Sequence, residues 1–168
     1  VGTGVVKALL SRGKLLTERA DVKLVLRKIL IRRPAEKKRM HPKIRSLLTE
    51  KADQLLKDPA IDIVVELIGG YDVAQELVLA AIENGKHVVT ANKALIAEHG
   101  NEIFAAAKEK GVTVAFEASV AGGIPIIKAI REGLSANRIQ WLAGIINGTG
   151  NFILTEMRDK GRAFEDVL

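Results

Sequence analysis

The sequence predicts an α/β protein built on a doubly wound, Rossmann-like parallel sheet. Short apolar runs alternate along the chain with longer helix-like segments, an order that favours parallel pairing of the strands. The runs are continuously apolar, as is typical of a sheet covered by helices on both faces. The composition agrees, since 168 residues with 48% apolar and 27% charged side chains are typical of a globular chain of about one domain.

The first third of the chain predicts a helix, a strand and a second helix. Residues 3–20 repeat apolar side chains on one face of a helix. Residues 22–31 are rich in β-branched residues and leucine, which predicts a strand that ends before Pro34. Residues 43–57 predict a polar helix that is broken at Asp58, because the residue before a proline leaves helical space.

The remaining elements are separated by glycines. Gly85 and Gly111 each follow a helical pattern, where a glycine is a common stop signal. The predicted strands are residues 62–68, 87–90, 112–116 and 138–146, and the predicted helices are residues 73–83, 93–110, 124–133 and 148–160.

The chain is predicted to divide near residues 121–123, where Ala-Gly-Gly lies between two elements. We expect residues 1–120 to form the wound domain and residues 121–168 to begin a second, α+β domain. The chain starts at Val1 and stops inside a helical pattern, so we expect a fragment whose sheet is truncated and lacks its first strand.

The composition excludes several classes of function. The chain has no cysteine, which rules out disulfides, thiolate metal sites and a cysteine nucleophile. No apolar run approaches the roughly 18 residues that a membrane span needs. The first residues lack the charged and then apolar segment that is typical of a signal peptide. We therefore expect no membrane partner and a cytoplasmic location.

Positive charge is concentrated in the first part of the chain. Residues 1–57 carry 16 Lys and Arg against five Asp and Glu, whereas residues 58–168 carry 10 against 15. The densest stretch, residues 27–45, is compatible with a solvated face, a nucleic-acid patch or a phosphate pocket. It contains no aromatic residue on which a base would stack, which argues against single-stranded nucleic acid as a partner.

Polar and small residues follow the predicted strands. In wound sheets, ligands bind at the carboxyl ends of the strands. The candidate site residues are therefore Arg32 and Arg33, Gly69 and Gly70, residues 90–93, residues 117–123 and residues 147–151. Any one of these groups is also explained by a simple turn, but a turn is the poorer explanation for all five together.

Two features of the first part of the chain, Gly2 and the Arg32–Arg33 group, suggest a dinucleotide. Gly2 fits the last glycine of a dinucleotide fingerprint, whose strand and earlier glycines would precede residue 1. About thirty residues later, the second strand ends in Arg32 and Arg33 rather than in an acid. Arginine at this place favours the 2′-phosphate of NADP, through charge-assisted bidentate hydrogen bonds. A solvated basic face is the alternative interpretation.

Lys93 is the candidate catalytic residue. It follows a buried strand and the small residues Thr90 and Ala91, and Asn92 is placed to cap the next helix. An ammonium group near a reacting oxygen stabilises an alkoxide or donates a proton. The alternative is a surface lysine at a helix start, although a cation in the first turn opposes the helix dipole.

Two loops are candidate ion or anion sites. Glu117 precedes a glycine-rich loop, and a carboxylate with backbone carbonyls suits a hard cation. One carboxylate favours a weak monovalent ion or none, and a hydrogen-bonded Glu at a strand end explains it equally well. The amides of residues 147–151 suit an anionic group, unless the segment is only a turn capped by Thr149 or Asn151.

Four stretches together resemble one enzyme family. They are VVELIGG at residues 64–70, GKHVVTANKA at 85–94, FEASVAGGIP at 116–125 and GIINGTGNFIL at 144–154. In this order and spacing the chain resembles homoserine dehydrogenase over most of residues 60–168. Residues 1–6 resemble more loosely the end of the family's glycine-rich loop.

The resemblance implies a reversible NADP- or NAD-dependent interconversion of L-homoserine and L-aspartate 4-semialdehyde, on the route to threonine and methionine. Residues 1–120 would be the NAD(P)-binding domain, and residues 121–168 would begin the catalytic and dimerisation domain of a homo-oligomer. The residues implied along the cofactor are Val1, Gly2, Arg32, Arg33, Gly69, Thr90 and Lys93. Lys93 would also reach the reacting centre.

The resemblance implies two further sets of contacts. A sodium ion would be held by Glu117 and the carbonyls of Val120, Gly122 and Ile124. The substrate would be faced by Gly148 and Thr149.

The sequence departs from the family's pattern in two ways. Gly150 replaces a usual threonine, which predicts a looser loop. The family's substrate-binding acids and its second catalytic lysine would lie beyond residue 168, so we expect the chain to be inactive by itself.

Three other interpretations stay open. The first is another NADP-linked reductase on the same fold, although an aspartate semialdehyde dehydrogenase would need a cysteine for its thioester. The second is a module that binds nucleic acid through residues 27–45. The third is a fragment without function, which folds poorly because its sheet has an unpaired edge.

Overall fold

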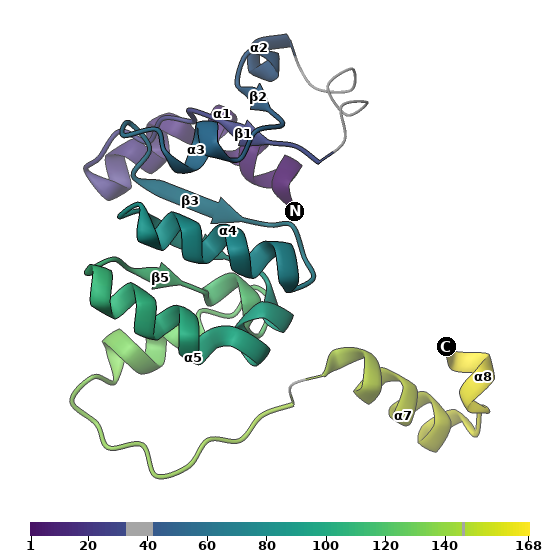
Figure 1. The fold of residues 1–168 in the computed structure, drawn as a ribbon. Helices are drawn as coiled ribbons and strands as arrows, with labels where there is room; N and C mark the ends of the chain where they lie inside the picture. The colour runs from purple at the N-terminus through teal and green to yellow at the C-terminus, as the bar shows by residue number, and fades with distance from the viewer. Residues whose placement is uncertain (33–41, 146) are drawn as a thin grey trace. The chain divides into compact units, whose positions relative to one another are not determined.

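The computed structural model describes residues 1–32, 42–145 and 147–168. The chain forms two compact units, Val1–Ile124 and Pro125–Leu168. The elements of the first unit, shown in Figure 1, are α1 (Gly2–Ala20), β1 (Ile29–Leu30), α2 (Pro42–Arg45), β2 (Leu48–Thr49), α3 (Asp53–Leu56), β3 (Ile63–Glu66), α4 (Asp72–Glu83), β4 (His87–Thr90), α5 (Lys93–Lys110), β5 (Val114–Ala115) and the 3₁₀ helix η2 (Glu117–Ser119).

The strands of the first unit pair in parallel and alternate with helices, which confirms the predicted α/β class. One sheet has three strands in the order β3-β4-β5, and a smaller sheet pairs β1 with β2. Glu66 lies opposite Thr90, so β3 and β4 end at the same level. The loops that follow these two strands are therefore held side by side at one edge of the sheet.

Helices α4 and α5 pack together over one face of the three-stranded sheet (Figure 1). Ile82 of α4 and Leu95 and Ile103 of α5 are completely buried in the core between them. Burial of each such side chain is worth about 1.5–3 kcal/mol. The burial alternates along β3, where Ile63 and Val65 are 47% and 43% exposed, so the expected cover on both faces is incomplete at this strand.

Several of the helices and strands predicted from the sequence are present in the structure. The structure confirms the helix predicted for residues 3–20 as α1, and the strand and helix predicted for residues 87–90 and 93–110 have the predicted bounds. Strands β3 and β5 are shorter than predicted, and so is β1, which forms only at the end of residues 22–31. No helix in the described ranges has both the length and the apolar character that crossing a membrane requires.

The helix predicted for residues 43–57 is wrong. This segment contains α2, then strand β2, then α3. The Thr49 hydroxyl accepts a hydrogen bond from the Lys51 amide at 3.1 Å and donates one to Gln54 at 2.7 Å. A threonine that bonds to its neighbours in this way offers the backbone an alternative to the helix, and β2 gains a partner in β1.

The second unit is mainly helical. It contains α6 (Ile126–Lys128), the π-helical turn η3 (Ala129–Gly133), α7 (Gly148–Lys160) and α8 (Phe164–Val167). The structure confirms the predicted bounds of α7, but the strand predicted for residues 138–146 is wrong. Residues 138–145 have no regular structure and are exposed, and residue 146 lies outside the described residues. The apolar composition of this segment favours a strand, but strand formation requires a neighbouring edge with which to pair.

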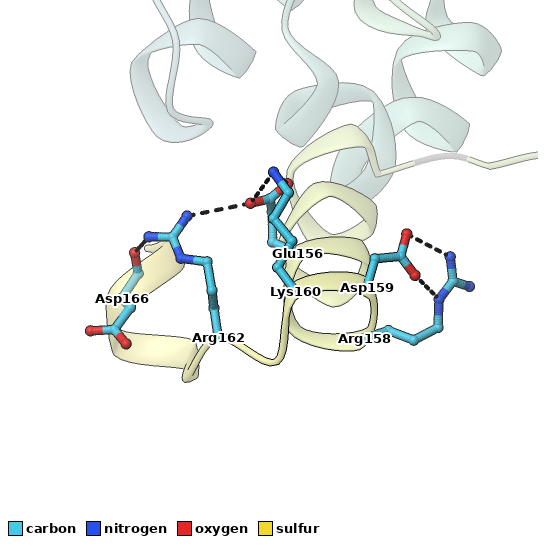
Figure 2. Close-up of polar contacts among 6 residues, drawn as sticks. All are labelled: Glu156, Arg158, Asp159, Lys160, Arg162 and Asp166. Atoms are coloured by element: carbon cyan, nitrogen blue, oxygen red, sulfur yellow. Dashed lines mark hydrogen bonds and ion pairs between the residues drawn. The ribbon is translucent and has the colours of Figure 1, made fainter.

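Arg162, which lies between α7 and α8, links the two helices through polar contacts (Figure 2). Glu156 contacts Lys160 at 2.8 Å and Arg162 at 3.3 Å. Arg162 also donates a hydrogen bond to the Asp166 carbonyl, and Arg158 pairs with Asp159. Hydrogen bonding from Lys160 is the main cause that lowers the pKa of Glu156, and Arg162 adds to the effect.

Candidate functional site

A pocket lies at the carboxyl ends of β3 and β4, where the sequence predicts a ligand. Its volume is about 360 Å³. It is lined by Val1, by residues 67–70 after β3, and by residues 91–94, which join β4 to α5. The structure thus brings together three predicted cofactor residues that are far apart in the sequence, namely Val1, Gly69 and Lys93.

The wall after β3 is made of bare backbone. Gly69 and Gly70 have φ values of 78° and 72°, which L side chains rarely adopt. No heavy atom lies within 4 Å of where a Cβ would stand at either position. The glycines are therefore required by the backbone turn, and the absence of side chains leaves the peptide groups accessible to a flat ring or a phosphate.

The opposite wall is the start of α5. Lys93 is the first residue of this helix, is exposed and lines the pocket. Asn92 caps the helix, as predicted, because its side-chain oxygen accepts a hydrogen bond from the Leu95 amide at 3.1 Å. The ammonium group and the free amides of the first helical turn make this side of the pocket positive.

A buried polar network, which the sequence analysis missed, adjoins the pocket and includes Asn92, one of its lining residues. The Glu66 carboxylate accepts hydrogen bonds from the Thr90 hydroxyl at 2.6 Å and from the Ile68 amide at 2.7 Å. The Thr90 hydroxyl accepts one from the Asn92 amide at 3.0 Å, and the Asn92 side chain donates one to the Gly70 carbonyl at 2.6 Å. Glu66, Thr90 and Asn92 are 3%, 1% and 7% exposed.

The sequence predicts that Thr90 lies along the cofactor. Among the residues that the structure describes, however, Thr90 is not one that lines the pocket. Its hydroxyl is engaged by Glu66 and Asn92. The signal that would have identified Glu66 is an acid at the end of an otherwise apolar run, because a carboxylate buried at a strand end needs several donors.

The structure describes only some of the cofactor-binding residues that are predicted before β2. Gly2 is the first residue of α1, and a Cβ there would stand 3.9 Å from Leu67 Cδ1, so the helix start lies close to the pocket wall. Arg32 is exposed and follows β1 by two residues. Arg33 lies outside the described residues, as does much of the basic stretch at residues 27–45.

The predicted sodium loop is a tight turn at the end of the first unit. Glu117 opens η2, and the Val120 amide donates to the Glu117 carbonyl at 3.2 Å. The Ile124 amide donates to the Ala121 carbonyl at 3.1 Å, and Gly123 has a φ of 86°. These bonds do not use the carbonyls of Val120, Gly122 and Ile124. The described ranges contain no cluster of three or more acidic or histidine side chains that suits a divalent metal.

The predicted substrate residues lie in the second unit. Gly148 and Thr149 form the exposed first turn of α7. The cap of this helix is Asn147, whose side-chain oxygen accepts from the Gly150 amide at 2.8 Å, so the alternative cap residues Thr149 and Asn151 are wrong. A Cβ at Gly150 would stand 3.4 Å from the Asn147 side-chain oxygen, which shows that the cap fits closely around this glycine.

Comparison with known families agrees with this architecture. Residues 1–117 match a family described as "Homoserine dehydrogenase, NAD binding domain", and residues 125–168 match one described as "Homoserine dehydrogenase". A homoserine dehydrogenase from Pseudomonas aeruginosa is 62% identical over 171 residues, which cover 100% of this chain and 38% of the relative. The chain thus spans 38% of the length of this relative.

Solved structures give the same result. A homoserine dehydrogenase from Thiobacillus denitrificans superposes with a TM-score of 0.90 at 58% identity, over 100% of this chain and 38% of that one. A hyperthermophilic archaeal homoserine dehydrogenase, solved in complex with NADPH, gives a TM-score of 0.62 at 31% identity, over 72% of this chain and 37% of that one.

Proposed function

Because the chain belongs to the homoserine dehydrogenase family, we propose that it contains the nucleotide-binding part of an enzyme that interconverts L-homoserine and L-aspartate 4-semialdehyde with NADP or NAD. The observation that carries the proposal is the pocket at the ends of β3 and β4. It combines a bare glycine wall with a lysine at a helix start, and it lies where wound sheets bind dinucleotides.

The cofactor in this proposal extends from the start of α1 to the start of α5. Val1, Gly2 and Gly69 offer backbone to the pyrophosphate and the ring, and Thr90 ends the strand beneath them. Arg32 and Arg33 hold a 2′-phosphate, which makes NADP the preferred form. This preference is supported by the absence of an acid at the end of β1 and by the NADPH bound to the archaeal relative.

The nicotinamide supplies hydride transfer when it is bound. Lys93 holds a positive charge beside the substrate oxygen, where negative charge develops as the carbonyl is reduced. Its place at the first turn of α5 adds the partial positive charge of the helix start to that of the ammonium. The same lysine also lines the pocket that receives the ring.

The domain roles form part of the proposal. Residues 1–120 bind the nucleotide, and residues 121–168 begin the catalytic and dimerisation domain of a cytoplasmic homo-oligomer. Gly148 and Thr149 face the substrate from the start of α7. Glu117 and the carbonyls of Val120, Gly122 and Ile124 hold a weakly bound sodium ion, and hard oxygen donors of this kind fit such an ion.

The proposal is tested in the full-length protein that contains this chain. We expect NADPH binding, measured by its fluorescence, and oxidation of homoserine with NADP. Lys93→Ala should lower kcat/KM by about 10²–10³-fold, which corresponds to the loss of one charge that stabilises the reacting oxygen. Lys108→Ala, at an exposed lysine near the other end of the same helix, is the matched control and should retain full activity.

Two results would contradict the proposal. Near-normal turnover by Lys93→Ala would remove this lysine from the chemistry. A protein that does not bind NADPH but binds DNA in a salt-dependent manner would instead support the nucleic-acid interpretation of the basic stretch.

A further inference from the structure

We propose that Thr90 is a positioning residue for the nucleotide, acting through Glu66 and Asn92 to fix both walls of the pocket. This inference rests on the proposed function, because it assumes that the pocket binds the nicotinamide end of the cofactor. It extends that function by assigning a role to Glu66 and Thr90, two buried side chains that do not line the pocket, and to Asn92, a buried residue that does.

The network joins segments that are remote in the sequence. Thr90 and Glu66 are 24 residues apart, and Asn92 and Gly70 are 22 apart. The Glu66 carboxylate holds the amides of Ile68 and, at 3.4 Å, Gly69. Each of the two pocket walls is therefore bonded to the network, and the distance between the walls depends on it.

Only a hydroxyl group can complete this network at position 90. The Thr90 oxygen donates to Glu66 and at the same time accepts from the Asn92 amide. Valine has the same shape but can neither donate nor accept, whereas serine can do both. In a site that is 1% exposed, water is not expected to replace the lost partner, so the loops must shift to satisfy the carboxylate and the amide.

A matched control exists in the same unit. Thr49 also ends a strand, is 6% exposed, donates to the Gln54 side chain at 2.7 Å and accepts from the amide two residues further on at 3.1 Å. Its hydroxyl makes the same kinds of bond as that of Thr90. However, its partners Lys51 and Gln54 do not line the pocket, whereas Asn92, a partner of Thr90, does. A loss of stability alone should therefore appear in both variants, and a loss of nucleotide binding only at Thr90.

The experiment uses the full-length enzyme and compares Thr90→Val, Thr90→Ser and Thr49→Val. We expect Thr90→Val to raise the Kd of NADPH by about tenfold, while the KM for homoserine changes by less than about twofold. Thr90→Ser should restore the Kd to within about threefold of the wild-type value, because it keeps both hydrogen bonds. Thr49→Val should lower the melting temperature and leave the Kd within about twofold of wild type.

The outcomes separate the inference from the proposed function. If the wild-type enzyme does not bind NADPH, the proposed function fails. If the wild type binds NADPH and Thr90→Val binds it as tightly as Thr49→Val does, only the inference is wrong. If Thr90→Val does not fold, Glu66→Gln serves instead. Glutamine keeps the side-chain shape but has one side-chain oxygen, so it cannot accept from the Thr90 hydroxyl and the Ile68 amide on separate oxygens as Glu66 does. An unchanged Kd in that variant would also overturn the inference.

Discussion

Helices α5 and α7, one in each unit of the chain, begin and end in the same way. Asn92 and Asn147 are both extended cap residues whose side chains accept a hydrogen bond from the third helical amide. Gly111 and Gly161 end the two helices with φ values of 67° and 62°. The local sequence signals of the two helices are therefore equivalent.

The surroundings of the two helices are different. Helix α5 buries Leu95, Gly100, Ile103 and Ala107, whereas α7 buries only Ile153 within its own unit. Asn92 is buried and also donates to the Gly70 carbonyl, while Asn147 is exposed. The comparison shows that the same cap can serve only its helix or can also join that helix to another loop, depending on what is packed around it.

The largest expected effect is the difference in stability loss when each of the two cap residues is replaced by alanine. We expect Asn92→Ala to reduce stability by about 2 kcal/mol, because it removes a helix cap and the part-buried hydrogen bond to the Gly70 carbonyl. Asn147→Ala removes only a cap and should cost about 1 kcal/mol. Hydrogen exchange of the amides of α5 and α7 measures the two losses separately. Equal losses in the two helices would mean that the bond to Gly70 adds nothing.

The two glycines that end α5 and α7 should contribute equally to stability, in contrast to the two N-terminal cap residues. A Cβ at Gly111 or Gly161 would meet no heavy atom within 4 Å, so an alanine is opposed only by the backbone conformation. We expect Gly111→Ala and Gly161→Ala each to cost about 1–2 kcal/mol, by the same local hydrogen-exchange measurement. A much larger loss at Gly111 would show that the packing of α5, and not the left-handed φ, determines the cost.

The same contrast explains how far the sequence predicts this molecule. The bounds of α5 and the role of Asn92 as its cap depend on neighbouring residues, and both are predicted correctly. The location of Lys93 beside the glycines after β3 follows from the rule for strand ends, which depends only on the order of the elements.

Interactions between distant segments are what the sequence analysis missed. The Glu66–Thr90 bond depends on the register that puts these residues opposite each other, and no local pattern specifies that register. The predicted helix at residues 43–57 failed for a related reason, because the pairing of β2 with β1 is a contact between distant segments. The predicted strand at residues 138–146 has the composition of a strand, but the second unit contains no strand with which to pair in the ranges described.

The smallest expected effect concerns the ion pairs of Glu156 with Lys160 and Arg162 at the end of α7 (Figure 2). The pKa of Glu156 is lowered below its usual value of 4.5, mainly by hydrogen bonding from Lys160. A carboxyl group whose pKa is lower in the folded state stabilises that state above its unfolded pKa, and this contribution is lost as the pH falls through the folded pKa. The stabilisation by Glu156 should therefore be complete at neutral pH and disappear below about pH 4.5.

The test compares wild type with Glu156→Gln by hydrogen exchange in α7 and α8 across this range of pH. The wild type should be slightly more protected at pH 7, and the two proteins should become equal in acid. Glu18→Gln is the control, because Glu18 and Lys14 are highly exposed and 3.9 Å apart, and the substitution should change nothing at any pH. A Glu156 effect that persists unchanged in acid would contradict the electrostatic explanation, because protonation removes the charge that Lys160 and Arg162 contact.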